Sequence, residues 1–269
     1  MEKSNAAVRL NRLLEEKKYR ILSGSALKIT ALVTMLIDHT AGVLLREIPA
    51  CTAPFFPAIS KTVTLYWCLR SIGRLAFPIY CFLITEGYAH THDKKKYGIN
   101  LLAFALISEI PWNLEHSGKL FYSSQNVFFT LFLGFLAICA YERYKEDMPE
   151  LLISMAALFG ASLLLRADYG AKGMAFILIL HIFREQKIVQ AFLGSCILSS
   201  PFAVSLAFIP INMYNGERGF IKSKPAKYAF YAIYPLHILL LYFLKKDGSD
   251  TDPNSHVSHT DIYAPKRFC

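Results

Sequence analysis

The chain has 269 residues, of which 54% are hydrophobic and 18% are charged, and its mean hydropathy is +0.34. Soluble domains usually carry about 25% charged residues, and apolar runs long enough to span a bilayer recur along this chain, so a water-soluble fold of this size is excluded. The net charge is +9. Because Lys and Arg lie mainly between the apolar runs, where they orient membrane helices, the expected partner is a lipid bilayer and not nucleic acid.

The apolar runs predict an all-α protein, a polytopic bundle of about eight transmembrane helices. In chain order the expected spans are 27–45, 72–89, 99–114, 127–141, 151–165, 173–183, 188–211 and 228–244. A loop with three prolines precedes the second span, and the seventh span contains Pro201 and Pro210. The transmembrane domain is therefore predicted to cover residues 26–245.

The two flanking segments differ in character. Residues 1–25 are basic and are expected to be cytoplasmic, either as a short amphipathic helix on the membrane surface or as a solvated leader. Their charge argues against a cleavable signal peptide. Residues 246–269 are rich in polar residues and are expected to be disordered.

Charge predicts the orientation in the membrane, which is expected to be the cytoplasmic membrane of a bacterium. A cytoplasmic N-terminus with eight crossings leaves most basic loops inside, as the positive-inside rule requires. The loop that carries Arg218, Lys222, Lys224 and Lys227 would then lie outside, against the rule. A hairpin that breaks the seventh span at 199–201 would bring this loop inside and move the C-terminus outside, so two topologies stay open.

Polar side chains inside the spans are candidate functional residues, since a charged side chain deep in a bilayer costs at least about 2.5–3.5 kcal/mol. Asp38 and His39 lie within the first span, and Lys28 lies at its start. The step from Lys28 to His39 is close to three helical turns, so the two share a face and lie about 16 Å apart along the axis. An imidazole can act as a general base near neutral pH, and the lysine could hold an anionic cofactor group.

Asp38 points about 100° away from its neighbour His39 on the helix, so it is expected to pair with a cation on another span. The alternative for all these residues is that they pair between helices and only stabilise packing.

Other polar residues mark the ends of the later spans. Arg70 and Arg74 lie one turn apart, and their planar guanidinium groups suit phosphate or carboxylate. Glu109, Asn113, Gln125 and Asn126 are expected to converge at one membrane face, because a short loop joins their spans. The remaining candidates are Glu86, Asp168, Tyr169, Asn215 and His237. The sequence contains no nucleotide-binding loop, serine-hydrolase elbow or zinc-protease motif, and no metal is expected.

Several short segments, in order along the chain, resemble the TraX family, whose founding role is acetylation of the pilin subunit of conjugative pili at its N-terminus. The resemblance covers nearly all of residues 25–245. The segments are 27–32 (LKITAL), 35–39 (MLIDH), 72–80 (IGRLAFPIY), 86–87 (EG), 108–111 (SEIP), 125–131 (QNVFFTL), 168–170 (DYG), 214–216 (YNG) and 234–237 (YPLH).

A wider likeness connects the chain to the membrane acyltransferase-3 superfamily, in which a basic residue, ten intervening residues and a histidine occupy the first span. Lys28 and His39 fit that spacing, and Arg70 and Arg74 followed by Pro78 and Tyr80 resemble its second motif. In that superfamily the histidine is taken as catalytic, and the basic residues are linked to acyl-CoA. The expected topology places both arginines near the outer face, so either residues 48–69 contain another crossing or the likeness does not extend to them.

The resemblance implies an integral membrane acyltransferase that moves acetyl from acetyl-CoA to an amine or hydroxyl. The acceptor would be a pilin-like peptide N-terminus or an envelope glycan or lipid. The catalytic group would be His39, Asp38 and Glu109, with Lys28, Arg70 and Arg74 on the acyl-CoA. The substrate would contact Glu86, Gln125, Asn126, Asp168, Tyr169, Asn215 and His237, and an oxyanion would face Arg74, Asn126 or Asn215.

Two other functions stay open. The first is a transporter or lipid-handling scaffold, in which the intramembrane polar residues line a pathway. Substrate flux in liposomes without an acyl donor would favour it. The second is a non-catalytic assembly protein for pilus or envelope machinery. Capture of a partner, together with indifference to His39→Ala, would favour that reading.

Overall fold

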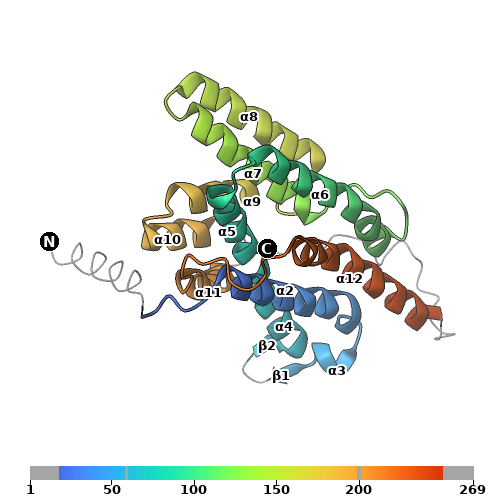
Figure 1. Cartoon of the computed structure of the whole chain (residues 1–269). Helices are drawn as coiled ribbons and strands as arrows, with labels where there is room; N and C mark the ends of the chain where they lie inside the picture. The colour runs from blue at the N-terminus through green and yellow to red at the C-terminus, as the bar shows by residue number, and fades with distance from the viewer. Residues whose placement is uncertain (1–17, 58–59, 199–200, 251–269) are drawn as a thin grey trace.

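The computed structural model describes residues 18–57, 60–198 and 201–250, which form a bundle of helices with one small two-stranded hairpin (Figure 1). Most of the predicted leader and most of the predicted tail lie outside the described residues. The part of the tail that is described, up to Asp250, continues the last helix.

The predicted multi-pass helical membrane protein is confirmed in its coarse form. Among the described residues, five stretches are long and apolar enough to cross a membrane, namely Gly24–Leu45, Leu65–His90, Val127–Tyr144, Met148–Leu165 and Pro225–Asp247. The long helices are α2 (Gly24–Thr40, continued by the π-helical turn η1, Ala41–Leu45), α4 (Leu65–Gly73) followed by α5 (Ala76–His90), α6 (Lys94–Ser117), α7 (Val127–Tyr144), α8 (Met148–Leu165) and α12 (Lys224–Asp250). The shorter ones are α9 (Gly170–Ile182), α10 (Lys187–Ile197) and α11 (Pro201–Asn212).

Capping residues set the helix ends that hydropathy alone misplaced. The side chain of Asp93 accepts a hydrogen bond from the backbone of Lys96, so α6 begins at Lys94 rather than at the expected residue 99. Ser23 and Asp147 cap α2 and α8 in the same way. A capping side chain accepts a hydrogen bond from a backbone N–H that has no partner within the helix. The helix can therefore begin among the charged residues that precede the apolar run. The spans are therefore longer than their apolar cores.

The seventh predicted span is a hairpin. Helices α10 and α11 pack against each other, and Ser205 donates a hydrogen bond to Ser195 at 2.8 Å. Each helix is only about 17 Å long, well short of the roughly 30 Å of a bilayer core. Of the two topologies that the sequence left open, the hairpin is the one that agrees with the packing of α10 and α11.

Inter-helix contacts bring the basic loops to one end, called here the basic end: the end that carries Lys94–Lys96, Lys145, Arg184 and Arg218. Leu22 forms a β-bridge with Tyr214, Arg184 pairs with Glu86, and the Lys227 ammonium lies 5.9 Å from the Tyr97 ring centroid. The loop that broke the charge rule is thus on the same side as the others. Helix α12 then carries the chain to the opposite end.

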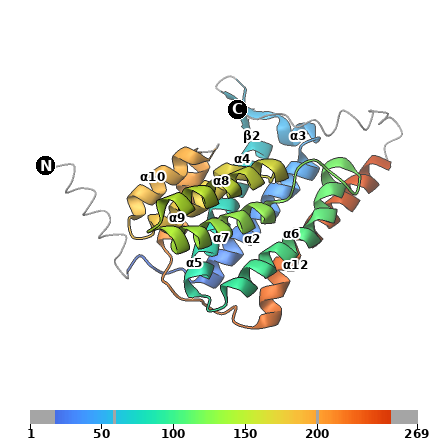
Figure 2. The same ribbon diagram turned by 90° about the horizontal axis from the view of Figure 1, so that it is seen from above.

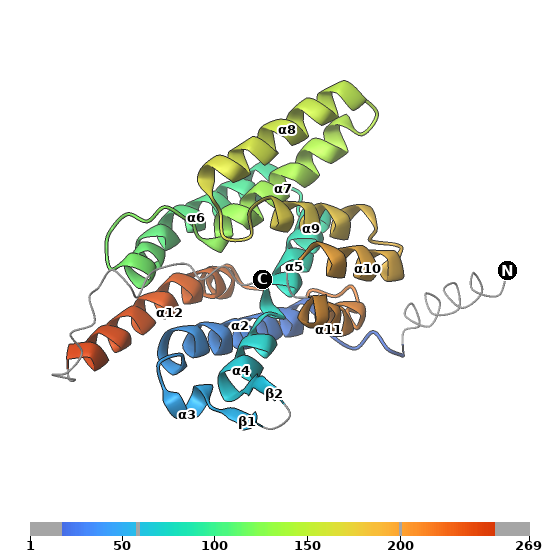
Figure 3. The same cartoon turned by 180° about the vertical axis from the view of Figure 1, so that it is seen from behind.

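Residues 48–64 lie at the opposite end and contain no further crossing in their described part. They form α3 (Pro49–Thr52) and the antiparallel strands β1 (Pro54–Phe56) and β2 (Ser60–Thr64), which project beyond α2 (Figure 3). The register pairs Pro54 with Thr64 and Phe56 with Ser60. Arg70 and Arg74 therefore do belong near this end.

The core lies where α2, α5, α7 and α9 meet, and α12 runs beside α6 (Figure 2). Helix α8 packs on the outside of α7, and Ser162 is its one fully buried residue. Its exposed residues are apolar, including Leu152, Ile153 and Leu164. Such a surface suits hydrocarbon rather than water.

The approach of α4 to α2 depends on Gly73. A Cβ at this position would lie 2.2 Å from the Cβ of Asp38. Gly73→Ala is therefore expected to destabilise the protein by about 1–3 kcal/mol through overpacking, measured as a lower Tm in detergent. Gly160→Ala is the matched control, because a Cβ there meets nothing within 4 Å. Equal Tm values for the two variants would contradict this account.

Candidate functional site

One cavity of about 980 Å³ runs along the inner face of α2. Helix α2 and its π-helical continuation contribute lining residues along their whole length, from Gly24 at the basic end to Arg46 at the other, a distance of roughly 30 Å. Helices α4, α5, α6, α7 and α12, residues 168–169 and the loop between α11 and α12 complete the walls. Lys28 and His39 both line this cavity, which confirms that they share one helix face.

His39 lies between the two mouths of the cavity. Its ring is nearly parallel to that of His237, with centroids 5.8 Å apart and an interplanar angle of 12°, and it meets Tyr234 edge-on at 5.7 Å. The Nδ1 atom of His39 is buried and has no hydrogen-bond partner among the described residues. Directly after His39 and Thr40, the helix widens into the π-helical turn η1, a feature often found at functional sites.

Asp38 pairs with Arg70, as the helical geometry predicted. The Arg70 Nη1 atom donates to Asp38 Oδ2 at 2.6 Å and to the Asp38 carbonyl at 3.2 Å. Arg74 follows α4 as its C-cap residue, and its charge also acts on Asp38. Arg70 thus lines the cavity beside Asp38 and not at the end where Lys28 lies. A role for either arginine in holding acyl-CoA stays a prediction.

Three cations line the mouth at the basic end: Lys28, Arg218 and Lys227, called here the cationic mouth. Arg218 and Lys227 both interact electrostatically with Lys28. Backbone bonds from Gly24 to Glu217 and from Ser25 to Arg218 hold the loop against the start of α2. In the described part of the chain no carboxylate forms an ion pair with these cations. Like charges gathered without a counterion favour an anionic ligand.

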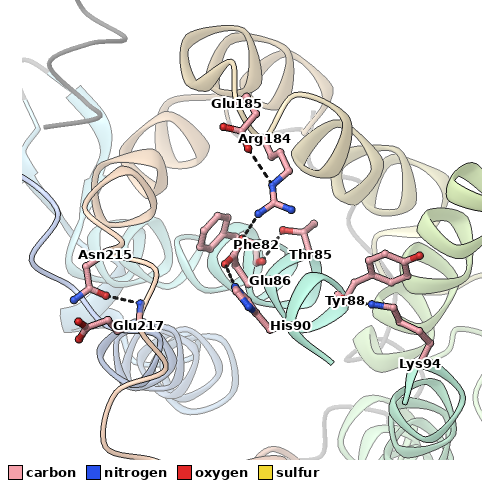
Figure 4. Close-up of polar contacts among 10 residues, drawn as sticks. All are labelled: Phe82, Thr85, Glu86, Tyr88, His90, Lys94, Arg184, Glu185, Asn215 and Glu217. Carbon is pink, nitrogen blue, oxygen red and sulfur yellow. Dashed lines mark hydrogen bonds and ion pairs between the residues drawn. The ribbon is translucent and has the colours of Figure 1, made fainter. Parts of the chain in front are cut away.

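Glu86 also lies at this mouth, within a network of polar contacts (Figure 4). Its carboxylate lies 3.3 Å from His90 Nε2 and 3.6 Å from Arg184. Burial, and then the charge of Glu86, raise the pKa of Tyr214 to about 12, so that the phenol stays neutral. The Asn215 side chain accepts a hydrogen bond from the Glu217 backbone at 2.9 Å. Asn215 therefore shapes its loop.

Glu109 and Asn126 lie close together, as predicted, but they meet at the contact between α6 and α7 and not in the cavity. Asn126 is fully buried, caps α7 by accepting from the Phe128 backbone, and donates to Glu109 Oε2 at 2.6 Å and to the Ala105 carbonyl at 2.8 Å. Gln125 exchanges backbone hydrogen bonds with Arg166 and Asp168. Glu109, Gln125 and Asn126 do not line the cavity. Their contacts join helices, and their proposed chemical roles stay predictions.

The opposite mouth contains residues that were predicted and residues that were missed. Asp168 and Tyr169 line it, and the Tyr169 ring stacks on Phe77 at 3.5 Å. Glu115 and His116 also line it and form an ion pair at 2.6 Å. The sequence prediction ended this span at residue 114, so the acidic residue and the histidine fell into a loop. Extending the helix to Gly118, a common C-terminal stop, would have found them.

A family model described as TraX protein matches residues 23–245. The chain is also similar to a protein of Dichelobacter nodosus named "Probable fimbrial assembly protein FimC, serogroup H1", with 28% identity over 248 residues, which is 81% of this chain and 94% of the relative. No solved structure matches the chain significantly. The matched range contains every residue that lines the cavity.

Proposed function

The chain belongs to the TraX family, and we propose that it is a membrane-embedded acyltransferase that moves acetyl from acetyl-CoA to an amine or hydroxyl. The observation that carries the proposal is the cavity along α2, which combines an imidazole at its centre with the cationic mouth at one end. A ligand that is anionic at one end and reactive at the other would fit both features.

Acyl-CoA is such a ligand. Its phosphates lie at one end and its thioester at the other, joined by a pantetheine arm about as long as an extended peptide of four or five residues, roughly 14–17 Å. Lys28 and His39 are separated by about 16 Å along α2. Phosphates at the cationic mouth would therefore place the thioester carbon beside His39.

The reaction needs a base and a stabiliser of negative charge. His39 would take the proton of the acceptor amine or hydroxyl as its nitrogen or oxygen bonds to the thioester carbon. The carbon–sulfur bond then breaks, and the thiolate of CoA takes the proton from the imidazolium. The Tyr234 hydroxyl is buried at the cavity wall, near the backbone of Val127. It would donate to the developing oxyanion.

The charge distribution supports a cytoplasmic position for the basic end, in a bacterial cytoplasmic membrane. Acetyl-CoA would then reach the cationic mouth from the cytoplasm. The D. nodosus relative is named as a fimbrial assembly protein, which favours the N-terminus of a pilin-like subunit as the acceptor over an envelope glycan or lipid. The lipid bilayer is the remaining partner.

Labelled acetyl-CoA and the full-length protein in detergent or proteoliposomes test the proposal. The expected result is saturable binding of acetyl-CoA, with slow release of labelled acetate or transfer of label to an added pilin-like peptide. Free CoA should compete. Absence of acetyl-CoA binding would overturn the proposal, and flux of a solute through proteoliposomes without any donor would identify a transporter instead.

The name of the relative also favours a second candidate, an assembly protein without catalysis. In that case the polar residues of the cavity would only pack helices or hold a fimbrial subunit. Complementation of a fimbriation defect separates the two candidates. A His39→Ala variant that restores fimbriae as well as the wild type, and still captures a fimbrial subunit, would favour assembly.

A further inference from the structure

Two buried imidazole nitrogens on neighbouring rings, one of them the cavity-lining His39, have no hydrogen-bond partners among the described residues. They are Nδ1 of His39 on α2 and Nε2 of His237 on α12, and neither has a partner among the described residues. An unsatisfied polar atom in a protein interior is energetically unfavourable, and such atoms are rare in native proteins. Two of them on neighbouring rings indicate a functional pairing.

Both helices are irregular beside these rings. The π-helical turn η1 starts at Ala41, two residues after His39, and Pro235 lies inside α12, two residues before His237. A proline removes one backbone hydrogen bond of a helix, and a π turn replaces the regular spacing with a wider one. Small shifts of either ring therefore cost less here than inside an ideal helix.

Two carboxylates near His39 are placed so that they do not orient its ring. Asp38 directs its Oδ2 to Arg70 at 2.6 Å, and although its Oδ1 has no partner among the described residues, the side chain leaves α2 about 100° away from that of His39. Glu115, whose charge acts on His39, is held by His116 at 2.6 Å. Neither therefore takes the part that a carboxylate has beside the histidine of many active sites. Of the groups that touch the His39 ring, His237 is the one with a ring nitrogen that can accept.

We propose that His237 is the positioning residue of His39, with its Nε2 accepting a hydrogen bond from the Nδ1–H of His39. A bond of about 2.9 Å between the two nitrogens would bring in-line ring centroids to roughly 5 Å. The centroids are 5.8 Å apart and the rings nearly parallel, so the bond forms when the rings move closer and turn the two nitrogens toward each other.

The bond would fix the tautomer of His39. With the proton on Nδ1, the Nε2 atom keeps its lone pair and is the nitrogen left for the cavity, where a base must accept a proton. Without this partner, His39 would also populate the tautomer in which Nε2 carries the proton and cannot act as a base. The consequence for catalysis rests on the proposed acyltransferase function, but the tautomer itself does not.

Nitrogen NMR of the full-length protein, labelled with ¹⁵N-histidine and kept in nanodiscs, tests the pairing directly. The His39 signal is assigned by its loss in His39→Gln. In the wild type it should report a protonated Nδ1 and an unprotonated Nε2. His237→Phe, which keeps a ring but has no acceptor, should move it toward the other tautomer. His237→Gln, whose carbonyl can accept, should preserve it, and Tyr234→Phe should leave it unchanged.

Kinetics supply the second readout. His237→Phe is expected to lower kcat for acetyl transfer about 10–100-fold, the size of the loss when a metal-binding histidine loses its orienting partner. The KM for acetyl-CoA should stay unchanged, and His237→Gln should recover part of kcat. A wild-type His39 protonated on Nε2, or a tautomer indifferent to His237→Phe in a protein that still elutes as a folded species, would overturn the pairing. The His39 signals could follow the expected pattern in the wild type and the His237 variants while no acetyl transfer is detected. That result would support the pairing and reject the acyltransferase function.

Discussion

Replacement of His39 by glutamine is expected to lower the rate of acetyl transfer by about 10²–10⁴-fold, the usual contribution of a general base. Glutamine has a similar size but cannot take a proton at neutral pH. Because His39 lies far along α2 from the cationic mouth, binding of acetyl-CoA should stay unchanged. Initial rates with labelled acetyl-CoA and calorimetric titration of the donor measure the two quantities separately.

His92→Gln is the matched control, since His92 is exposed in the short link between α5 and α6 and does not line the cavity. Its rate should equal that of the wild type. A His39→Gln variant that keeps wild-type turnover would contradict the proposed mechanism. Loss of both turnover and donor binding would instead point to a structural role for the imidazole, so thermal unfolding of each variant accompanies the assay.

Removal of charge from the cationic mouth should raise the KM for acetyl-CoA and leave kcat unchanged. Lys28→Ala and Arg218→Ala are each expected to raise KM about tenfold, because a hydrogen bond between charged groups contributes about 1.5–3 kcal/mol. The double variant should approach a hundredfold if the two contacts are independent. The effect should shrink at high salt, since ions screen charges near a water-filled mouth.

Lys222→Ala is the control for this series, because Lys222 lies in the same basic loop but does not line the cavity. Its KM should match that of the wild type. Acetyl-dephospho-CoA, which lacks one phosphate, should bind the wild type more weakly than acetyl-CoA does. With this donor, the difference in KM between the wild type and the variants should be smaller. A fall in kcat at constant KM would mean that these cations act on the reaction and not on the donor phosphates.

The amino-acid sequence by itself determined the membrane character and one face of the site. Apolar run length decides whether a segment favours lipid, and this is a local property of the chain. The shared face of Lys28 and His39, and the outward turn of Asp38 toward another helix, follow from 3.6 residues per turn. For the same reason the cation that pairs with Asp38 could be expected but not identified.

Only the tertiary structure decided which distant residues meet. The seventh apolar run forms two helices, α10 and α11, that pack on each other, and the loop that follows α11 lies with Arg218 beside Lys28 at the cationic mouth. Asn126 and Glu109 form a hydrogen bond that connects α6 with the start of α7. His237, which is distant in sequence, lies beside His39. Local periodicity sets which face a residue occupies on its own helix, whereas the partner of that face depends on how the helices pack, which is a property of the whole bundle.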